Sequence, residues 1–387
     1  MNGGDDIVLG SDVGVRFGKS IQHPGAYPLP PFATSPAEVK SFRSEFASRL
    51  DVEELAEGRS NNYDIDERVT AGYAMTELQL TPALMLLPGV RYEHTKATAI
   101  GYDFDPDAET LTEQRGEKNY GRFFPMVHLR YALSSGTNLR ASFTNTIARP
   151  NFVDLVPYRI RDDEDLAIGN PDLDPTTARH FDLLLEHYDQ RIGVLTAGLF
   201  YKQLTDPIFV FTEDNTLGGE TEQPRNGESG TIRGIELAAQ KQLRFLPAPF
   251  NGLGLFANYT YTDSEAELPG GRKARLQGQA DHVFNTALSY DRRGFTGQIS
   301  LNYHDDYVDE YGGDSGDPDE RFEDIYVDRR LQLDFSASQR VNGRATIFLE
   351  LINLTNEPYR AFQGVGERPI QMEYYERWGR LGVRYSW

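Results

Sequence analysis

The feature that most constrains the fold is a strict two-residue alternation of apolar and polar side chains over long segments. In 295–306, Phe295 and Ile299 fall on one face, while Gln298 and Asn302 fall on the other. This period indicates a β-strand with one apolar and one polar face. Because the same pattern recurs along most of the chain, we predict an all-β fold.

Thirteen segments with this alternation follow one another. Each spans about 10–16 residues, which is longer than a usual soluble strand and enough for a tilted strand to cross a bilayer. The segments are 66–80, 84–98, 118–133, 137–149, 177–188, 192–203, 229–241, 252–264, 281–291, 293–306, 326–340, 343–354 and 371–387. A weaker segment at 5–18 brings the expected total to about 14 strands.

The connections between these segments alternate in length. Short turns such as "TPA" and "SSG" alternate with five long stretches, at 99–117, 150–176, 204–228, 307–325 and 355–370. One connection of medium length, 242–251, falls on the short side. Short turns at one rim and long loops at the other are typical of an antiparallel transmembrane β-barrel. A soluble β-sandwich has no reason to sort its loops in this way.

The acidic residues gather in the long connections. The chain has 59 Asp and Glu against 39 Lys and Arg, a formal charge of −20. Most of this excess lies in 102–118, 161–175, 212–228 and 305–324. The strands are therefore free to face lipid, because charge at the ends of a barrel costs little. The same balance argues against a nucleic-acid partner, whose phosphates require a basic face.

Several familiar signals are missing from the sequence. There is no cysteine, so disulfides and thiolate metal sites are excluded. No apolar run approaches the ~20 residues of a transmembrane helix. The first residues, "MNGGDDIVLGSDVG", lack the pattern of a signal peptide. Together with the barrel pattern, this leads us to expect that the chain lacks its native beginning.

The chain ends on an alternating strand, "RLGVRYSW". Arg380, Gly382, Tyr385 and Trp387 form a pattern that resembles the C-terminal signal presented by outer-membrane proteins to the barrel-assembly machinery. Most such signals end in Phe, so the final Trp is a mild departure. The resemblance implies the assembly machinery and outer-membrane lipid as partners.

Three stretches resemble the TonB-dependent receptors of Gram-negative outer membranes. They are 71–95, then 145–158 with 169–188, and 348–359 with 368–387. With the strands between them, the resemblance covers about 63–387. It implies an outer-membrane location, a small-molecule ligand, and TonB as the partner of the full-length parent.

The chain departs from that family at its beginning. Such receptors have a signal peptide, a TonB-box segment, a plug domain and a barrel of twenty-two strands. We therefore expect 1–387 to be the C-terminal part of such a barrel, with the plug and first strands absent and transport by this chain alone lost. Within it, we expect a weak strand, a long external loop and a short helix near 36–58 to make up 1–65, and thirteen meandering strands to make up 66–387.

Catalytic and metal-binding patterns are weak. No nucleophile, metalloprotease or phosphate-loop motif is present, so we predict no enzyme and no cofactor. Asp103, Asp105 and Asp107 are spaced like the start of a calcium loop, but Ala108 replaces the expected Gly and Gln114 the expected Glu. They are weak metal candidates, and diffuse attraction of cations by the acidic rim is the favoured alternative.

The parent receptor would capture its ligand at the outer mouth with aromatic and arginine side chains. The candidates are Tyr158, Arg159, Arg161, Phe209 and Phe211 in the long loops, with Arg140 and Arg330 on strand faces predicted to point inward. A ferric siderophore, a glycan fragment and a vitamin all remain open as ligands. The alternative function is a soluble or surface-exposed β-rich binding module, which predicts strands about half as long and no sorting of loops. A secreted enzyme on a β scaffold is a third possibility that lacks a catalytic set.

Overall fold

The computed structural model of the chain describes residues 62–385, with gaps at 106–109, 163, 191–192, 269–270 and 313–322. The weak strand expected at 5–18 and the short helix expected at 36–58 lie outside the described residues, as does Trp387. None of the described residues belongs to a helix that is long and apolar enough to cross a membrane.

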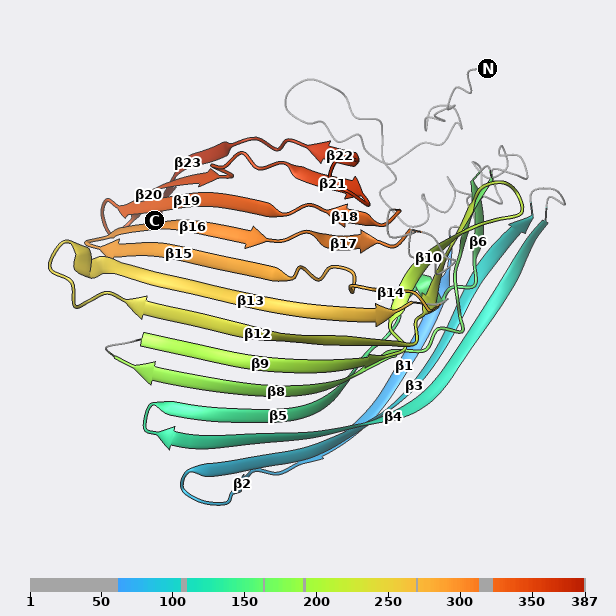
Figure 1. Cartoon of the computed structure of the whole chain (residues 1–387), viewed down its shortest axis with the longest axis horizontal. Coiled ribbons are helices and arrows are strands. Elements are labelled where there is room, and N and C mark those ends of the chain that lie inside the picture. The colour runs from blue at the N-terminus through green and yellow to red at the C-terminus, as the bar shows by residue number, and fades with distance from the viewer. Residues whose placement is uncertain are drawn as a thin grey trace, which may run out of the picture.

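Thirteen long strands of the described residues form one antiparallel meander, which we call the wall (Figure 1). Each wall strand pairs with the next one along the chain. The strands are β1 (Asp64–Met75), β3 (Leu84–Asp105), β4 (Thr110–Ser134), β5 (Thr137–Ala148), β8 (Thr176–Asp189), β9 (Gly193–Thr205), β12 (Ser229–Gln242), β13 (Leu253–Glu267), β15 (His282–Arg292), β16 (Phe295–His304), β19 (Arg330–Arg340), β20 (Ala345–Ile352) and β23 (Trp378–Tyr385). The all-β antiparallel fold class expected from the sequence is confirmed.

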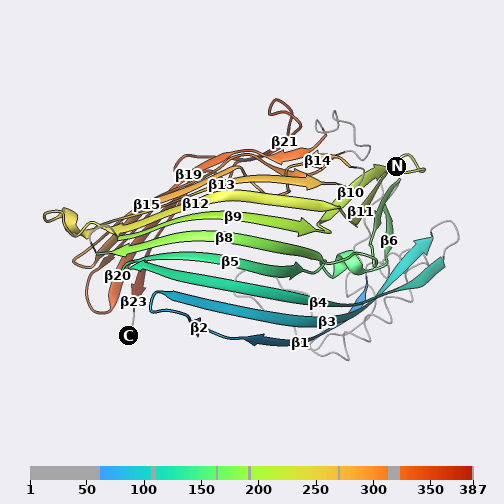
Figure 2. The same ribbon diagram turned by 60° about the horizontal axis from the view of Figure 1, so that its bottom comes forward.

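The wall curves without closing on itself (Figure 2). Within the described residues, β1 pairs only with β3, and β23 pairs only with β20. The short β2 (Leu78–Gln79), in the turn after β1, also pairs with β3. The strands nevertheless curve around one concave side, as strands of a barrel do. The expectation of a partial transmembrane-type barrel is therefore confirmed.

The convex face of the wall is apolar along continuous rows that cross many strands. One row runs through paired residues of seven neighbouring strands, namely Leu86, Leu129, Ala141, Leu183, Leu199, Ile235 and Tyr261. Leu199 is 53% exposed and Ile235 41% exposed, although both lie in the middle of the wall. Exposed apolar rows of this extent require a non-aqueous neighbour.

The concave face carries polar side chains at the same height. Asn258, Asn285, Asn302 and Gln332 are paired in order across β13, β15, β16 and β19. The Asn285 amide donates to the Asn258 side-chain oxygen at 2.9 Å. Alternate residues therefore face two different surroundings, which is the physical reason for the period of two in the sequence.

Several stretches that we expected to be loops contain strands. These are β6 (Arg159–Asp162), β7 (Asp165–Ile168), β10 (Ile208–Asp214), β11 (Glu220–Asn226), β17 (Tyr307–Glu310) and β21 (Tyr359–Gln363). The connection after β13 contains the short β14 (Lys273–Ala274). The expected strands 326–340 and 371–387 are each interrupted, so that β18 (Ile325–Val327) and β22 (Pro369–Glu373) are separate from β19 and β23. The stretch 99–117 is also not a free loop, because β3 and β4 continue their ladder as far as Asp105 and Thr110. The expectation failed because these segments are stabilised by pairing with one another rather than by their own local pattern.

Candidate functional site

The long connections fold into a cap at the loop rim of the wall, opposite the rim of short turns (Figure 1). The cap consists of the described residues of the segments 149–175, 206–228, 268–281, 305–329 and 353–377. One small sheet joins the β6–β7 and β10–β11 hairpins through a parallel contact between β7 and β11. A second sheet has the order β17, β18, β21, β22.

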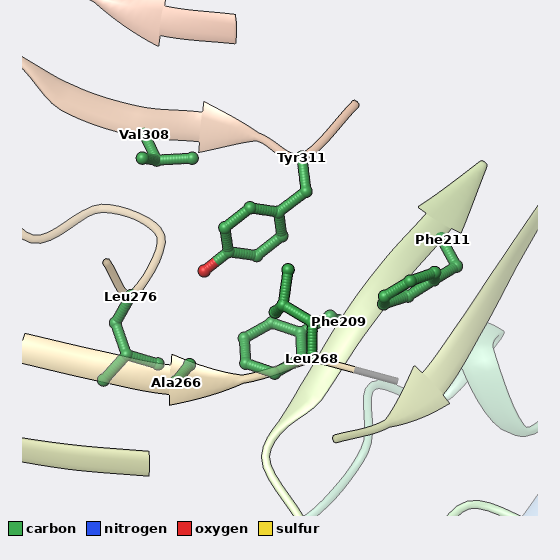
Figure 3. Close-up of a cluster of buried hydrophobic side chains, with 7 residues drawn as sticks. All are labelled: Phe209, Phe211, Ala266, Leu268, Leu276, Val308 and Tyr311. Atoms are coloured by element: carbon green, nitrogen blue, oxygen red, sulfur yellow. The ribbon is translucent and has the colours of Figure 1, made fainter. Parts of the chain in front are cut away.

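A buried apolar cluster holds three of these segments together (Figure 3). This cap cluster contains Phe209, Phe211, Ala266, Leu268, Leu276, Val308 and Tyr311. The ring of Phe209 meets the ring of Tyr311 edge-on at 5.4 Å between centroids. The Tyr311 hydroxyl donates to the carbonyl of Arg275 at 2.6 Å, and burial raises the pKa of this phenol. The Tyr311 phenol therefore stays neutral and hydrogen-bonded inside the cluster.

A buried ion pair lies beside the cap cluster. Arg272 bonds to Asp324, and the two side chains are only 9% and 2% exposed. The other oxygen of Asp324 accepts from the amide of Gly312 at 3.0 Å, and Arg272 donates to the Gly312 carbonyl at 2.7 Å. The Asp324 carbonyl accepts from the amide of Gly364 at 2.8 Å. The pair thus connects the segments 268–281, 305–329 and 353–377.

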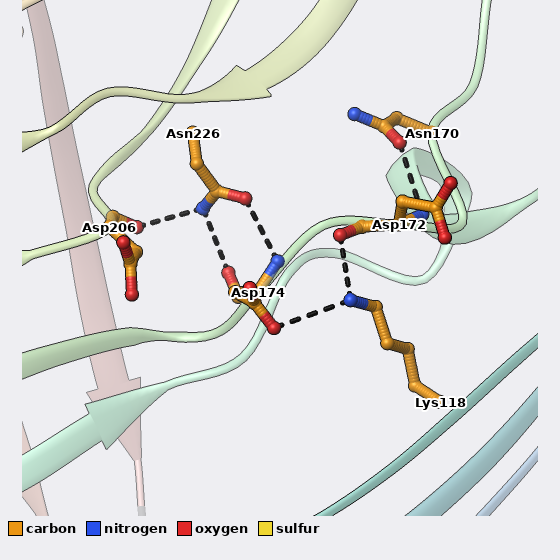
Figure 4. A network of polar contacts seen from close by, with 6 residues as sticks. All are labelled: Lys118, Asn170, Asp172, Asp174, Asp206 and Asn226. Carbon is orange, nitrogen blue, oxygen red and sulfur yellow. Dashed lines mark hydrogen bonds and ion pairs between the residues drawn. The ribbon is translucent and has the colours of Figure 1, made fainter.

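A polar network fixes the other side of the cap to the wall (Figure 4). The Asn226 side chain donates to the carbonyls of Asp174 and Asp206, and it accepts from the Asp174 amide, each at 2.9 Å. The Lys118 ammonium on β4 donates to the Asp172 carbonyl at 2.7 Å and pairs with Asp174 at 3.3 Å. Loops that are far apart in sequence are therefore held in one arrangement.

Three of the predicted ligand residues lie at the start of β6. Arg159 and Arg161 are exposed, and Arg159 pairs with Ile168 in the hairpin. Tyr158 is partly buried against Gly169, and burial raises the pKa of its phenol. This hairpin presents cationic side chains at the loop rim, next to the tip of β3.

Phe209 and Phe211 belong to the cap cluster and are 3% and 4% exposed. Arg225 lies over the Phe211 ring, with its guanidinium carbon 6.0 Å from the ring centroid. In this arrangement the two rings hold the loops together, and a ligand reaches them only if the cap opens. The sequence predicted that Phe209 and Phe211 lie in a loop at the mouth, but it did not show that their rings face the interior of the cap rather than the solvent.

Arg140 and Arg330 both lie on the concave side of the wall, at opposite ends. Arg140 is close to the short turn before β5, and its Nε donates to Glu186 at 2.6 Å. Arg330 begins β19 at the loop rim, opposite His304. The Nε of Arg330 is buried and has no hydrogen-bond partner among the described residues. The structure therefore brings Arg330, and not Arg140, close to the cap.

Aromatic side chains from three segments lie at the loop rim near Arg330. We call Arg330, His304, Tyr307, Tyr359 and Tyr375 the inner-rim cluster, because each of them is paired with, in ring contact with or electrostatically coupled to another member. The His304 ring lies 5.7 Å from the Tyr307 ring. The pKa of Tyr359 is raised mainly by burial and further by Asp309 and Tyr307. Arg330 is near enough to Tyr375 for its charge to act on that phenol.

Sequence reasoning found only Arg330 of this cluster. The others come from three separate segments, the ends of β16 and β17, β21, and the stretch after β22. Aromatic residues flank the charges in "NYHDDY" and "EPYRAF", which is a weak signal that the sequence alone did not distinguish from a strand end. An ion pair joins β21 to the residue that follows β18, because Arg360 pairs with Asp328 at 2.6 Å.

The candidate metal ligands are placed differently from a calcium loop. Asp103 and Asp105 lie in the extended ladder of β3, opposite Thr112 and Thr110. Asp107 lies outside the described residues. No group of His, Asp and Glu among the described residues is arranged to hold a metal ion.

Arg380, Gly382 and Tyr385 of the C-terminal pattern lie in the last wall strand, β23. Arg380 pairs with Glu350 at 2.5 Å on the concave face, and its guanidinium lies over the Phe348 ring. Gly382 is opposite Phe348, and a side chain at Gly382 would meet that ring. Tyr385 is exposed on the convex face.

The loop rim thus offers guanidinium groups and phenols on strands that the cap fixes. Guanidinium groups bind oxyanions through charge-assisted hydrogen bonds, and phenols add stacking and a polar group. Such a surface suits a compact anionic or aromatic molecule.

Comparison with protein families gives one match. The family described as "TonB dependent receptor-like, beta-barrel" matches residues 9–354. Comparison with curated proteins gives no match.

Solved structures share the fold at low sequence identity. The ferric-catecholate import receptor Fiu from E. coli K12 is 16% identical with a TM-score of 0.61, over 84% of this chain and 45% of that chain. The siderophore receptor PiuA from Acinetobacter baumannii is 15% identical with a TM-score of 0.58, over 84% and 44%. The ferric yersiniabactin uptake receptor FyuA from Yersinia pestis is 16% identical with a TM-score of 0.58, over 84% and 46%. The chain spans about half the length of these structures.

Proposed function

The chain belongs to the TonB-dependent receptor-like β-barrel family, and from this premise we propose that it forms the wall and mouth of an outer-membrane receptor for a scarce small nutrient. The observation that carries the proposal is the contrast between the two rims, because the described residues of the five cap segments all lie at a single rim, opposite the short turns. A cap held by its own core can present a fixed binding surface to the outside.

The proposed location is the outer membrane of a Gram-negative bacterium, with lipid against the convex face. The exposed rows through Leu199 and Ile235 support lipid as a partner. The strand with Arg380, Gly382 and Tyr385 would present the signal for the barrel-assembly machinery. In the complete receptor, energy for uptake would come from TonB. A soluble binding module, the alternative, would leave those apolar rows in water.

The proposed ligand class is a ferric siderophore, with glycan fragments and vitamins as the other candidates. Fiu, PiuA and FyuA are a ferric-catecholate import receptor, a siderophore receptor and a ferric yersiniabactin uptake receptor, and this supports the choice of an iron complex. In this chain, the inner-rim cluster and the pair Arg159 and Arg161 would bind the anionic complex. We propose a receptor role without catalysis, and therefore no cofactor.

Membrane orientation can be tested by cysteine labelling, since the chain has no cysteine of its own. Thr216→Cys places a thiol at the exposed tip between β10 and β11, and Gly343→Cys places one in the β19–β20 turn, where a side chain meets nothing within 4 Å. The full chain is carried to the periplasm behind a cleavable leader. In intact cells an impermeant maleimide should label Thr216→Cys alone, and permeabilised cells should label both. Labelling of both in intact cells, or of neither, would contradict the proposal.

Ligand binding can be tested with Arg330→Gln. A guanidinium that bonds a charged ligand contributes about 1.5–3 kcal/mol, so the dissociation constant for a ferric catecholate probe should rise about 10-fold or more. Arg344→Gln, in a short turn at the other rim, is the matched control and should bind as the unmodified chain does. Equal binding by both variants would remove the inner-rim cluster from the proposal.

A further inference from the structure

The turn between β12 and β13 differs from the other described turns at its rim. It is longer than they are, and Figure 2 shows it projecting past the neighbouring turns, in yellow. Its sequence, "LRFLPAPFNG" (243–252), contains no acidic residue. Phe245 is 73% exposed and Phe250 is 56% exposed. Two exposed phenylalanines at the tip of a turn need an apolar or interfacial neighbour.

The turn leans toward the convex face of the wall. Tyr290 lies on that face, and its hydroxyl donates to the carbonyl of Pro249 at 3.1 Å. Lys241 is on the same face, opposite Leu255, and its ammonium lies 5.9 Å from the centroid of the Phe245 ring. The turn therefore lies where the apolar band of the wall ends.

Basic side chains accompany the two phenylalanines. Lys241, Arg244 and Phe245 line a groove beside the β8–β9 turn, and Arg292 follows Tyr290 at the end of β15 on the convex face. Lys241 donates to the carbonyl of Gln190 at 3.3 Å. None of the salt bridges between described residues uses these three basic side chains. Asp189 also lines the groove and has an interaction of its own.

We propose that the segment 241–252, together with Arg292, is a binding site for an anionic phospholipid in the leaflet at the short-turn rim. Phe245 and Phe250 would enter the boundary between headgroups and acyl chains, where aromatic side chains concentrate. Lys241, Arg244 and Arg292 would bind the lipid phosphate, since basic residues near the surface bind anionic lipid. This inference rests on the proposed function, because it requires the wall to be in a membrane.

The test is native mass spectrometry of the full chain, folded in detergent and titrated with phosphatidylglycerol. Lys241→Gln with Arg244→Gln should weaken retention of the lipid by about 5- to 25-fold, because each basic residue near an anionic surface contributes about 5-fold. Arg340→Gln with Arg344→Gln removes the same charge from the β19–β20 turn at the same rim and should change nothing. Equal loss in both variants, or no loss in either, would overturn the site. Excess inorganic phosphate should not displace the lipid, and displacement would also overturn it.

A second measurement separates this inference from the proposed function. Phe245→Trp adds a fluorophore to the two native tryptophans, and vesicles with phospholipid brominated near the headgroup should quench the added emission. Leu217→Trp, at the tip of the cap, should stay unquenched. Quenching of neither variant, with no insertion into vesicles, would contradict the membrane proposal itself. Insertion without quenching of Phe245→Trp would overturn only the lipid site.

Discussion

The wall and the cap use apolar side chains in opposite ways. In the wall, leucines such as Leu183, Leu199 and Leu237 are among the most exposed side chains of their strands. In the cap, Phe209, Leu268 and Val308 are almost completely buried. The wall is one layer thick and has no interior of its own, whereas the cap has a core like that of a soluble domain.

The difference follows from the surroundings of each region. A single sheet cannot bury both faces, and in the proposed location lipid takes the place of a second layer against the convex face. The cap stands in water at the rim and must bury its apolar side chains against each other. A mutation should therefore have different effects in the two regions, even when the chemical change is similar.

The largest expected effect is in the cap. Asp324→Ala leaves the Arg272 charge buried and unpaired, and this should destabilise the cap by about 3–5 kcal/mol. Cleavage of the loops by chymotrypsin, followed at increasing urea concentration, would measure the loss, while the wall strands should stay resistant. Glu265→Gln breaks the exposed pair between Lys273 and Glu265, whose side chains are 61% and 58% exposed, and should leave the resistance of the cap almost unchanged. If Asp324→Ala were as resistant as the unmodified chain, the buried pair would not hold the cap.

In the wall, the effect of a substitution on stability should depend on whether the residue lies on the convex or the concave face, and not on how deeply it is buried. Leu199→Arg, on the convex face near the middle of β9, should destabilise the folded chain in lipid by about 2–4 kcal/mol. Thr196→Arg lies three residues away on the concave face, beside Glu186 and Ala238, and should change stability little. Urea titration of the chain folded into vesicles, followed by tryptophan fluorescence, would compare the two. Equal losses of stability in Leu199→Arg and Thr196→Arg would mean that both faces of the wall meet the same solvent.

The same contrast explains what the sequence could predict. Each wall strand reads as alternation because its two faces meet different solvents, so strands such as β16 and β19 could be placed from the sequence to within a few residues. The strands of the cap meet other loops instead. In β11, "ETEQPRN", no residue pattern indicates a strand, and its partners β10 and β7 determine its conformation.

The candidate site was less predictable than the fold. Phe209 and Phe211 in "IFVFT" have apolar neighbours on both faces, which is typical of a buried strand and could have separated them from Arg159 and Arg161. The inner-rim cluster could not be found in this way. Its members come from separate segments that meet only after the meander and the cap have formed.

The smallest expected effect is a pH dependence within the cap. Burial raises the pKa of Asp154, although a hydrogen bond from Asn151 acts in the opposite direction. A carboxyl whose pKa is higher in the folded state stabilises the fold when protonated, and this contribution is lost as pH rises through the folded-state value. At pH 7 the ionised carboxylate is therefore unfavourable, and Asp154→Asn should stabilise the cap slightly, by less than about 1 kcal/mol because the group is only partly buried.

Urea unfolding of the cap at pH 7 and at pH 3 would show the gain in stability at pH 7 and its disappearance in acid. A gain that grew as the pH fell would contradict the assignment, and the wall should unfold identically in both chains.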